Sequence, residues 1–171
     1  MSLVIRALAE ADSLADLTAL LHAAYAQLGQ LGFNYTAVDQ SEDETRRRIA
    51  GGECYMASDD GRLIGTIMFY RNSKGHHPWY SRPEVATVGQ FAVAPAFQRH
   101  GIGARLMALV EDRAVATGAA EIALDTSEGA AHLIAWYTRL GYRLVGHAQW
   151  TGKTYRSVIL SKALATSRPG K

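Results

Sequence analysis

The hydrophobic residues of this chain follow a helical period near the N-terminus. They recur at intervals of three and four positions, at Leu14, Leu17, Leu21, Ala24 and Leu28. This spacing predicts an amphipathic helix over residues 13–28, because positions three and four apart share one helical face. A short apolar run at residues 3–6 precedes this helix and predicts a first strand.

Polar residues and glycines mark the next boundaries. Ser41-Glu42-Asp43-Glu44 matches a capping box, so we expect a second helix to begin there and to end at Gly51-Gly52. Residues 54–58 and 63–70 have strand character and flank Asp59-Asp60-Gly61, a sequence typical of a tight turn. Together these segments predict a β-hairpin.

The second half of the chain alternates between strand and helix patterns. We expect strands near residues 87–93, 121–125, 142–146 and 155–160, and helices at 103–117 and 129–140. A strand, a helix and a strand in succession favour a parallel crossover. The order of elements therefore predicts an α/β or α+β domain with a mixed sheet between helices.

One junction between a strand and a helix carries candidate chemistry. It is the segment Gln98-Arg99-His100-Gly101-Ile102-Gly103, which follows the strand at 87–93 and opens the helix at 103–117. Glycines let the backbone approach a ligand closely, and the first turn of a helix has N–H groups without intrahelical acceptors. With the positive end of the helix dipole, this arrangement predicts a site for an anion such as a diphosphate.

The glycine segment differs from two common phosphate-binding motifs. A dinucleotide-binding fingerprint needs a third glycine where this chain has Leu106, and it expects no insertion such as residues 94–100 after the strand. A Walker-type phosphate loop needs Gly-Lys-Ser/Thr, which the sequence lacks. A tight turn without a ligand is the remaining structural alternative.

Composition limits the class of protein. With 171 residues, 48% of them hydrophobic and 20% charged, the chain is long enough for one well-packed domain, which we place at residues 1–166. The polar residues 167–171 are expected to form a disordered tail. A net charge of +2 is too small to argue for nucleic-acid or membrane binding.

Cysteine content and hydropathy indicate the cellular compartment in which the protein is expected. The single cysteine, Cys54, excludes an intrachain disulfide framework and a multi-cysteine zinc site, so we expect no metal. No apolar run approaches the roughly 18 residues of a membrane span, and the N-terminus lacks the pattern of a secretory signal. These features predict a cytoplasmic protein.

Three segments resemble the GNAT-type N-acetyltransferases, in that family's order. Val93-Ala94-Pro95-Ala96-Phe97-Gln98-Arg99-His100-Gly101-Ile102-Gly103-Ala104 is similar to the family's acyl-CoA signature. Glu121 to Thr126 resembles its next strand, and Ala135 to Tyr142 its following helix and turn. The resemblance implies the GNAT fold, a mixed sheet of six to seven strands flanked by helices. In that fold two parallel strands, here 87–93 and 121–125, splay apart to form the acyl-CoA cleft.

The resemblance also implies which residues bind acetyl-CoA. The backbone of Phe91, Ala92 and Val93 would meet the pantetheine arm, in the manner of an added strand. The segment after that strand would hold the diphosphate, with the residues Gln98, Arg99, His100, Gly101, Ile102, Gly103 and Ala104.

Tyr137 matches the tyrosine that the family commonly uses as the acid for the departing thiolate. A phenol with a reference pKa of about 10 is protonated at neutral pH and can serve a thiol with a pKa of about 8.5. The alternative is a core aromatic residue beside Trp136. Many members carry a glutamate base where this chain has Thr87, so Glu84 is the candidate substitute. The histidines His76 and His77, and bulk water, remain open as other routes for the proton.

The resemblance also implies that two loops, which family members use to bind the acceptor amine, form the acceptor site. They carry the aromatic residues Phe33, Tyr35, Trp79 and Tyr80. Aromatic walls with few acidic residues favour a small, partly apolar or amino-acid-like amine over a polycation.

The resemblance implies an N-acetyltransferase that moves an acetyl group from acetyl-CoA to a primary amine of a small molecule or peptide, by direct attack in a ternary complex. The alternative is a non-catalytic acyl-CoA-binding regulatory module, which Thr87 in place of glutamate would fit. A nucleic-acid function using Arg46-Arg47-Arg48 is disfavoured by the low net charge, and these arginines are expected to form a solvated helix face. Both a monomer and a homodimer remain open.

Overall fold

A computed structural model describes residues 2–72 and 76–165, and the tail expected at 167–171 lies outside them. The chain divides into two compact units. The first comprises Met1–Tyr70 and Gly89–Leu109, and the second Arg71–Val88 and Val110–Lys171. Strand β4 (Val85–Val93) and helix α3 (Ile102–Ala116) each begin in one unit and end in the other.

The first unit contains the elements predicted for the N-terminal part of the chain. They are β1 (Leu3–Ala7), α1 (Leu14–Gln30), α2 (Glu42–Ile49), β2 (Glu53–Asp59) and β3 (Arg62–Tyr70), and a short 3₁₀ helix, η1 (Thr36–Val38), lies between α1 and α2. Ser13 and Ser41 cap the two α-helices, because their hydroxyls accept hydrogen bonds from the N–H groups of Asp16 and Glu44. Helix α1 runs two residues beyond the expected range.

The hairpin of β2 and β3 is built around its turn. Asp60 and Gly61 have φ angles of 47° and 81°, which match the right-handed twist of the flanking strands. Antiparallel pairing continues from Asp59↔Arg62 to Glu53↔Phe69, with a register shift between Ala57 and Ser58.

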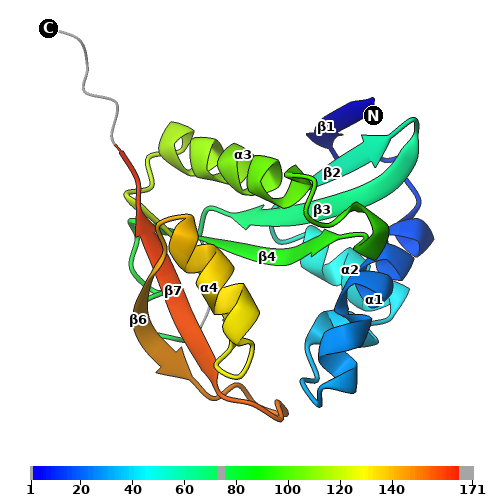
Figure 1. Ribbon diagram of the computed structural model, residues 1–171. Helices are drawn as coiled ribbons and strands as arrows, with labels where there is room; N and C mark the ends of the chain where they lie inside the picture. Colours follow the sequence, from blue (N-terminus) through cyan, green and yellow to red (C-terminus); the bar gives the residue numbers. More distant parts are fainter. Residues whose placement is uncertain (1, 73–75, 166–171) are drawn as a thin grey trace, which may run out of the picture. The chain divides into compact units, whose positions relative to one another are not determined.

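The core of the first unit lies between α1 and these strands. Leu17 and Leu21 of α1 pack with Cys54 of β2 and Met68 of β3. Helices α1 and α2 lie together beside these strands (Figure 1). Gly65 and Met68 lie on opposite faces of β3, since successive residues of a strand alternate between faces. A Cβ on Gly65 would meet Leu106 of α3 at 3.2 Å.

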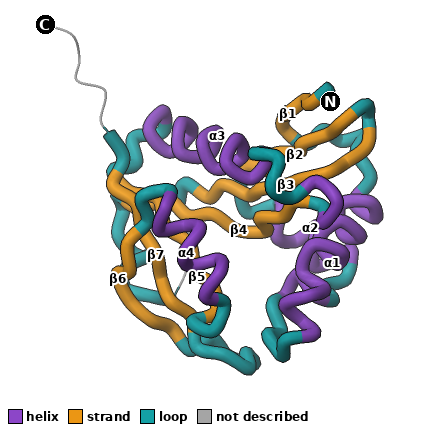
Figure 2. The backbone as a smooth tube through the Cα atoms, viewed as in Figure 1, coloured by secondary structure: helices purple, strands orange, loops and turns teal. Residues whose placement is uncertain are grey.

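The second unit contains the elements predicted for the C-terminal part. They are β5 (Glu121–Ser127), α4 (Ala131–Arg139), β6 (Arg143–Ala148) and β7 (Ser157–Ala163). Figure 2 shows β5, β7 and β6 as neighbouring strands, and both of their pairings are antiparallel. Gly141, with φ 98°, follows α4 as expected for a helix-ending glycine.

The predicted parallel pair is present. Strand β4 pairs with β5 in parallel from Val85↔Glu121 to Thr87↔Ala123. By hydrogen bonding, the strands follow the order β1-β2-β3-β4-β5-β7-β6, a mixed sheet of seven strands. The expected fold class is therefore confirmed. No helix within residues 2–72 and 76–165 is long and apolar enough to cross a membrane.

Candidate active site

The predicted diphosphate segment is an exposed turn with an unusual backbone. After the 3₁₀ helix η2 (Pro95–Phe97), Arg99 and Gly101 both have positive φ angles, 63° and 79°. The side chain of Gln98 donates from Nε2 to the carbonyl of Val93 at 3.1 Å, and His100 Nδ1 bonds the Gln98 carbonyl at 2.8 Å. These contacts shape the turn without using the N–H groups that follow it.

The first turn of α3 leaves three N–H groups without intrahelical acceptors. Its first helical hydrogen bond runs from Arg105 N–H to the Gly101 carbonyl at 3.1 Å, so Ile102, Gly103 and Ala104 precede the first donor. A Cβ on Gly101 would meet nothing within 4 Å, and glycine is therefore needed there for its backbone angle. The exposed N–H groups and the helix dipole suit a diphosphate.

The strand before this turn carries an irregularity at Gln90, whose φ is 43°. Left-handed backbone at a non-glycine residue is strained and clusters at functional sites. At the next residue, the Phe91 carbonyl accepts a hydrogen bond from the Tyr25 hydroxyl at 2.8 Å. The Val93 carbonyl accepts a hydrogen bond from the Gln98 side chain at 3.1 Å, so side-chain donors contact the backbone of β4 at both Phe91 and Val93.

Tyr137 lies on α4 and is 8% exposed. Its ring makes edge contacts with Trp136 and Tyr142, at centroid distances of 5.1 and 5.9 Å. Tyr142 in turn donates to Glu111 Oε1 at 3.0 Å, and burial is the main cause that raises the pKa of Tyr142. The ring of Tyr137 is thus held by an aromatic cluster, and its role as an acid stays a prediction.

The candidate bases differ in their surroundings. Glu84 Oε1 accepts from Arg82 Nε at 2.7 Å, and its own backbone N–H together with Arg82 lowers the pKa of this carboxyl. A lowered pKa keeps Glu84 charged but makes it a weaker base. His77 Nε2 donates to the His147 carbonyl at 3.1 Å, and Thr87 is buried.

The four acceptor-site candidates fall into the two units. In the first, the Tyr35 ring packs at 5.4 Å from Tyr25, and Phe33 is partly buried. In the second, Tyr80 is 7% exposed and donates to Asp125 Oδ1 at 2.7 Å, and its neighbour Trp79 stacks under Arg82 at 4.2 Å. Burial, with the nearby Asp125 charge, raises the pKa of Tyr80.

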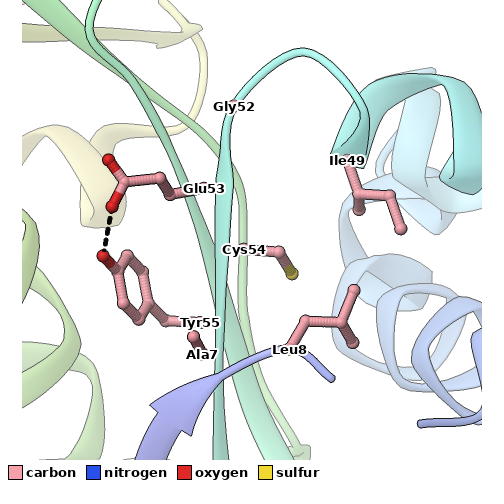
Figure 3. A pocket seen from close by; sticks show the side chains of 7 residues that line it. All are labelled: Ala7, Leu8, Ile49, Gly52, Glu53, Cys54 and Tyr55. Carbon is pink, nitrogen blue, oxygen red and sulfur yellow. Dashed lines mark hydrogen bonds between the residues drawn. The ribbon is translucent and has the colours of Figure 1, made fainter. Parts of the chain in front are cut away.

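The first unit contains a pocket whose lining includes none of the predicted site residues (Figure 3). It is lined by Ala7, Leu8, Ile49, Gly52, Glu53, Cys54 and Tyr55. The Tyr55 hydroxyl donates to Glu53 Oε1 at 2.5 Å, and burial raises the pKa of the Cys54 thiol. A protonated, buried thiol is a poor nucleophile, so Cys54 is not a candidate catalytic residue. In residues 2–72 and 76–165, no cluster of three His, Cys, Asp or Glu side chains could hold a metal.

The first unit also contains a buried polar network that was not predicted from the sequence. Gln40, Thr45 and Gln90 are 4%, 0% and 4% exposed, and hydrogen bonds of 2.7 Å join Gln40 Nε2 to the other two. Arg48 donates to Gln40 Oε1 at 2.8 Å. The signal in the sequence was a glutamine inside an otherwise apolar strand, since buried polar side chains need partners.

Comparison with models of protein families identifies the family of this chain. The model of the acetyltransferase (GNAT) family matches residues 17–142, most of the chain. The chain belongs to the GNAT family. The turn at 98–101 and the parallel strands β4 and β5 lie inside the matched region.

Individual relatives agree with this membership. The chain is 29% identical over 160 residues to the S-(2-succino)cysteine N-acetyltransferase of Bacillus subtilis (strain 168), with 91% of each chain covered. Its fold is similar to that of the ribosomal-protein-S18-alanine N-acetyltransferase from Escherichia coli (TM-score 0.73, 17% identity, 99% of this chain and 98% of that one). It is also similar to a GNAT family acetyltransferase from Elizabethkingia anophelis solved with acetyl-CoA bound (TM-score 0.68, 19% identity, 95% and 98% covered).

The predicted enzyme class is confirmed. This GNAT protein is an N-acetyltransferase, and its family and fold favour catalysis over the non-catalytic alternative. Acetyl-CoA is the cosubstrate that the family and the fold support, and the exposed turn before α3 fits its diphosphate.

Proposed function

We propose that this GNAT enzyme transfers the acetyl group of acetyl-CoA to the primary amine of a small, amino-acid-like molecule, by direct attack in a ternary complex. The observation that carries the proposal is the exposed turn with positive φ at Arg99 and Gly101. It is followed by three N–H groups that have no intrahelical acceptor.

In this proposal the diphosphate accepts hydrogen bonds from the N–H groups of Ile102, Gly103 and Ala104. The backbone around Gly101 faces it too, while Gln98, Arg99 and His100 shape and flank the turn. The main chain of Phe91, Ala92 and Val93 pairs with the pantetheine amides.

The reaction forms a C–N bond and breaks a C–S bond. The neutral amine attacks the thioester carbonyl carbon, and a backbone N–H near Ala92 or Val93 stabilises the developing oxyanion. The C–S bond then breaks, and Tyr137 gives its phenolic proton to the departing thiolate. The amine loses its extra proton to water, with Glu84 as the candidate that relays it.

The acceptor class has two supports. The relative from Bacillus subtilis is named for acetylating an S-substituted cysteine, an amino acid with a thioether in its side chain. Of the aromatic candidates, Phe33 and Tyr35 of the first unit suit a partly apolar molecule of that kind. We therefore expect α-amino acids with thioether or apolar side chains to be acceptors.

The test uses the full chain, purified free of CoA. We expect micromolar binding of acetyl-CoA by calorimetry, followed by release of free CoA thiol on addition of an acceptor. The acceptor panel contains L-methionine, L-phenylalanine and S-methyl-L-cysteine, each paired with its α-carboxamide. S-(2-succino)-L-cysteine is added without an amide, because its side chain carries two further carboxylates. Binding without transfer to any primary amine would contradict the catalytic proposal, and absence of binding would contradict the diphosphate site.

A further inference from the structure

Three arginines in a row on α2 have different surroundings. Arg46 pairs with Asp43 at 2.5 Å and Arg47 pairs with Glu44, and both arginines are exposed, so the expected solvated face is confirmed for these two but not for Arg48. Arg48 is partly buried and forms no ion pair among residues 2–72 and 76–165. Glu44 is paired with Arg47, whose hydrogen bond lowers the pKa of this carboxyl, and the charge of Arg48 helps to lower it. A guanidinium removed from water is costly without a counter-charge, so this position suits an anion from outside the chain.

The contacts of Arg48 place it beside strand β4. Its Nη2 lies 3.9 Å from the position that a Cβ on Gly89 would occupy, and its Nη1 donates to Gln40 Oε1 at 2.8 Å. The guanidinium therefore lies next to the residue that precedes Gln90, and most of its N–H donors remain available.

Arg48 also sets the orientation of two buried amides. Arginine can only donate, so the contacting atom of Gln40 is its carbonyl oxygen and its NH₂ group lies on the other side. That NH₂ group uses both hydrogens, one to Thr45 Oγ1 and one to Gln90 Oε1, each at 2.7 Å. The Oε1 atom of Gln90 therefore accepts a hydrogen bond from Gln40. Exchanging the oxygen and nitrogen positions of the Gln90 amide would place its NH₂ group against the NH₂ group of Gln40.

The NH₂ group of Gln90 is therefore a hydrogen-bond donor that a ligand could use. Its side chain is 4% exposed, and within residues 2–72 and 76–165 the NH₂ group has no hydrogen-bond partner. Nor is its nitrogen among the fully enclosed, unpartnered atoms of this part of the chain, which are Trp79 Nε1 and Ser157 Oγ. A buried amide whose donor is oriented, unpaired and not fully enclosed is a feature of a binding site.

We infer that Arg48 and Gln90 form a subsite for the carboxylate of the acceptor. A carboxylate accepts from a guanidinium and from an amide NH₂ group together, and it would form the direct ion pair that Arg48 lacks among the described residues. The left-handed backbone at Gln90, φ 43°, aims its side chain at Gln40. Gln40 is a positioning residue that fixes which atom of Gln90 is free. The inference rests on the proposed function and narrows its acceptor to an amine that carries a carboxylate.

The test compares acids with their amides. For each L-amino acid of the panel that is paired with its α-carboxamide, kcat/KM of both compounds is measured with wild type, Arg48→Met and Gln90→Glu. Wild type should prefer the acid, and both substitutions should reduce that preference on the order of 10-fold or more, through KM. Gln90→Glu keeps the oxygen that accepts from Gln40 but replaces the donor by a second oxygen, which repels a carboxylate.

Two controls separate binding from folding. Arg47→Met removes an exposed arginine from the same helix and should leave the ratio of acid to amide unchanged. Acetyl-CoA affinity, measured by calorimetry, should stay at the wild-type value in all three variants. A ratio that is the same in wild type, Arg48→Met and Gln90→Glu, with the fold intact, overturns the inference.

A second readout does not depend on turnover. The side-chain NH₂ signals of Gln90 in ¹⁵N NMR, assigned by their loss in Gln90→Glu, are followed while the panel is added. They should shift with the amino acids and stay in place with the carboxamides. If wild type transfers acetyl groups to no amine, the proposed function fails, and this titration still decides the subsite. Absence of a shift with every amino acid overturns it.

Discussion

The two units of this GNAT enzyme present their candidate groups in opposite ways. In the first unit, the important groups are backbone N–H donors after Gly101 and the side chains of Arg48 and Gln90, which keep donors without partners among the described residues. In the second unit, Tyr80 and Glu84 are already paired, with Asp125 and Arg82. Open donors indicate a ligand more directly than paired side chains do, because their partners must come from outside.

The largest expected effect breaks the diphosphate site in the first unit. Gly101→Asp should weaken acetyl-CoA binding by on the order of 100-fold or more, measured by calorimetry. The aspartate must adopt a φ near 79° and adds a negative charge beside a dianion. Gly61→Asp is the matched control, since its φ is 81° and a Cβ there also meets nothing within 4 Å. Equal loss of binding in both variants would assign the effect to strain.

The next effect tests the second unit. Tyr137→Phe should lower kcat by on the order of 100-fold while acetyl-CoA affinity stays the same, because only the proton donor is removed. Tyr142→Phe is the control, as it also removes a buried hydroxyl from the same aromatic cluster. Unchanged turnover in Tyr137→Phe would make this tyrosine a packing residue and leave the second unit without an assigned acid.

A smaller effect compares the buried polar contacts of the units. Thr45→Val should lower the free energy of unfolding by about 1–3 kcal/mol, since it removes a hydrogen-bond partner of Gln40 and of Thr18 in the interior. Tyr80→Phe should cost less, about 1 kcal/mol, because Asp125 keeps its bond to Trp150 Nε1 at 2.9 Å. Urea unfolding of both variants measures the two values, and the reverse order would contradict the comparison.

The smallest effect is a pH dependence in the first unit. Hydrogen bonds from Arg6 lower the pKa of Asp12 to about 2. A carboxyl with a folded pKa below its unfolded value stabilises the fold at neutral pH, and this contribution is lost as the pH falls from about 4 towards 2. The stability difference between wild type and Asp12→Asn should therefore shrink over that range. The measurement is the urea midpoint of both proteins at each pH, and a constant difference would contradict it.

Much of the fold could be predicted because its signals are local. The caps at Ser13 and Ser41, the turn at Asp60-Gly61 and the helix end at Gly141 depend on residues within a few positions. The predicted strands shifted at their ends, as where β7 begins at Ser157 opposite Ser127. Strand ends depend on the partner strand, which a single sequence does not reveal.

In the candidate site, too, features that depend on neighbouring residues could be predicted, and features that depend on distant residues could not. The diphosphate turn was predictable, since glycine at a positive φ before a helix is a local property of the chain. The separation of Arg48 from Arg46 and Arg47 was not, and neither was the pairing of Gln40 with Gln90, fifty positions apart. Which of the three arginines forms no ion pair within the described residues depends on what packs against each one.

By itself, the sequence determined the order of elements, the exposed turn and the family resemblance. Hydrophobic periodicity, helix capping and the backbone angles of glycine depend on residues that are close together in the chain. The tertiary structure decided which polar side chains are satisfied. Hydrogen bonds in a protein interior join residues from distant segments, and their donors and acceptors must match in direction as well as in type. Arg48, Gln40 and Gln90 acquire their shared orientation only when α2 and β4 meet.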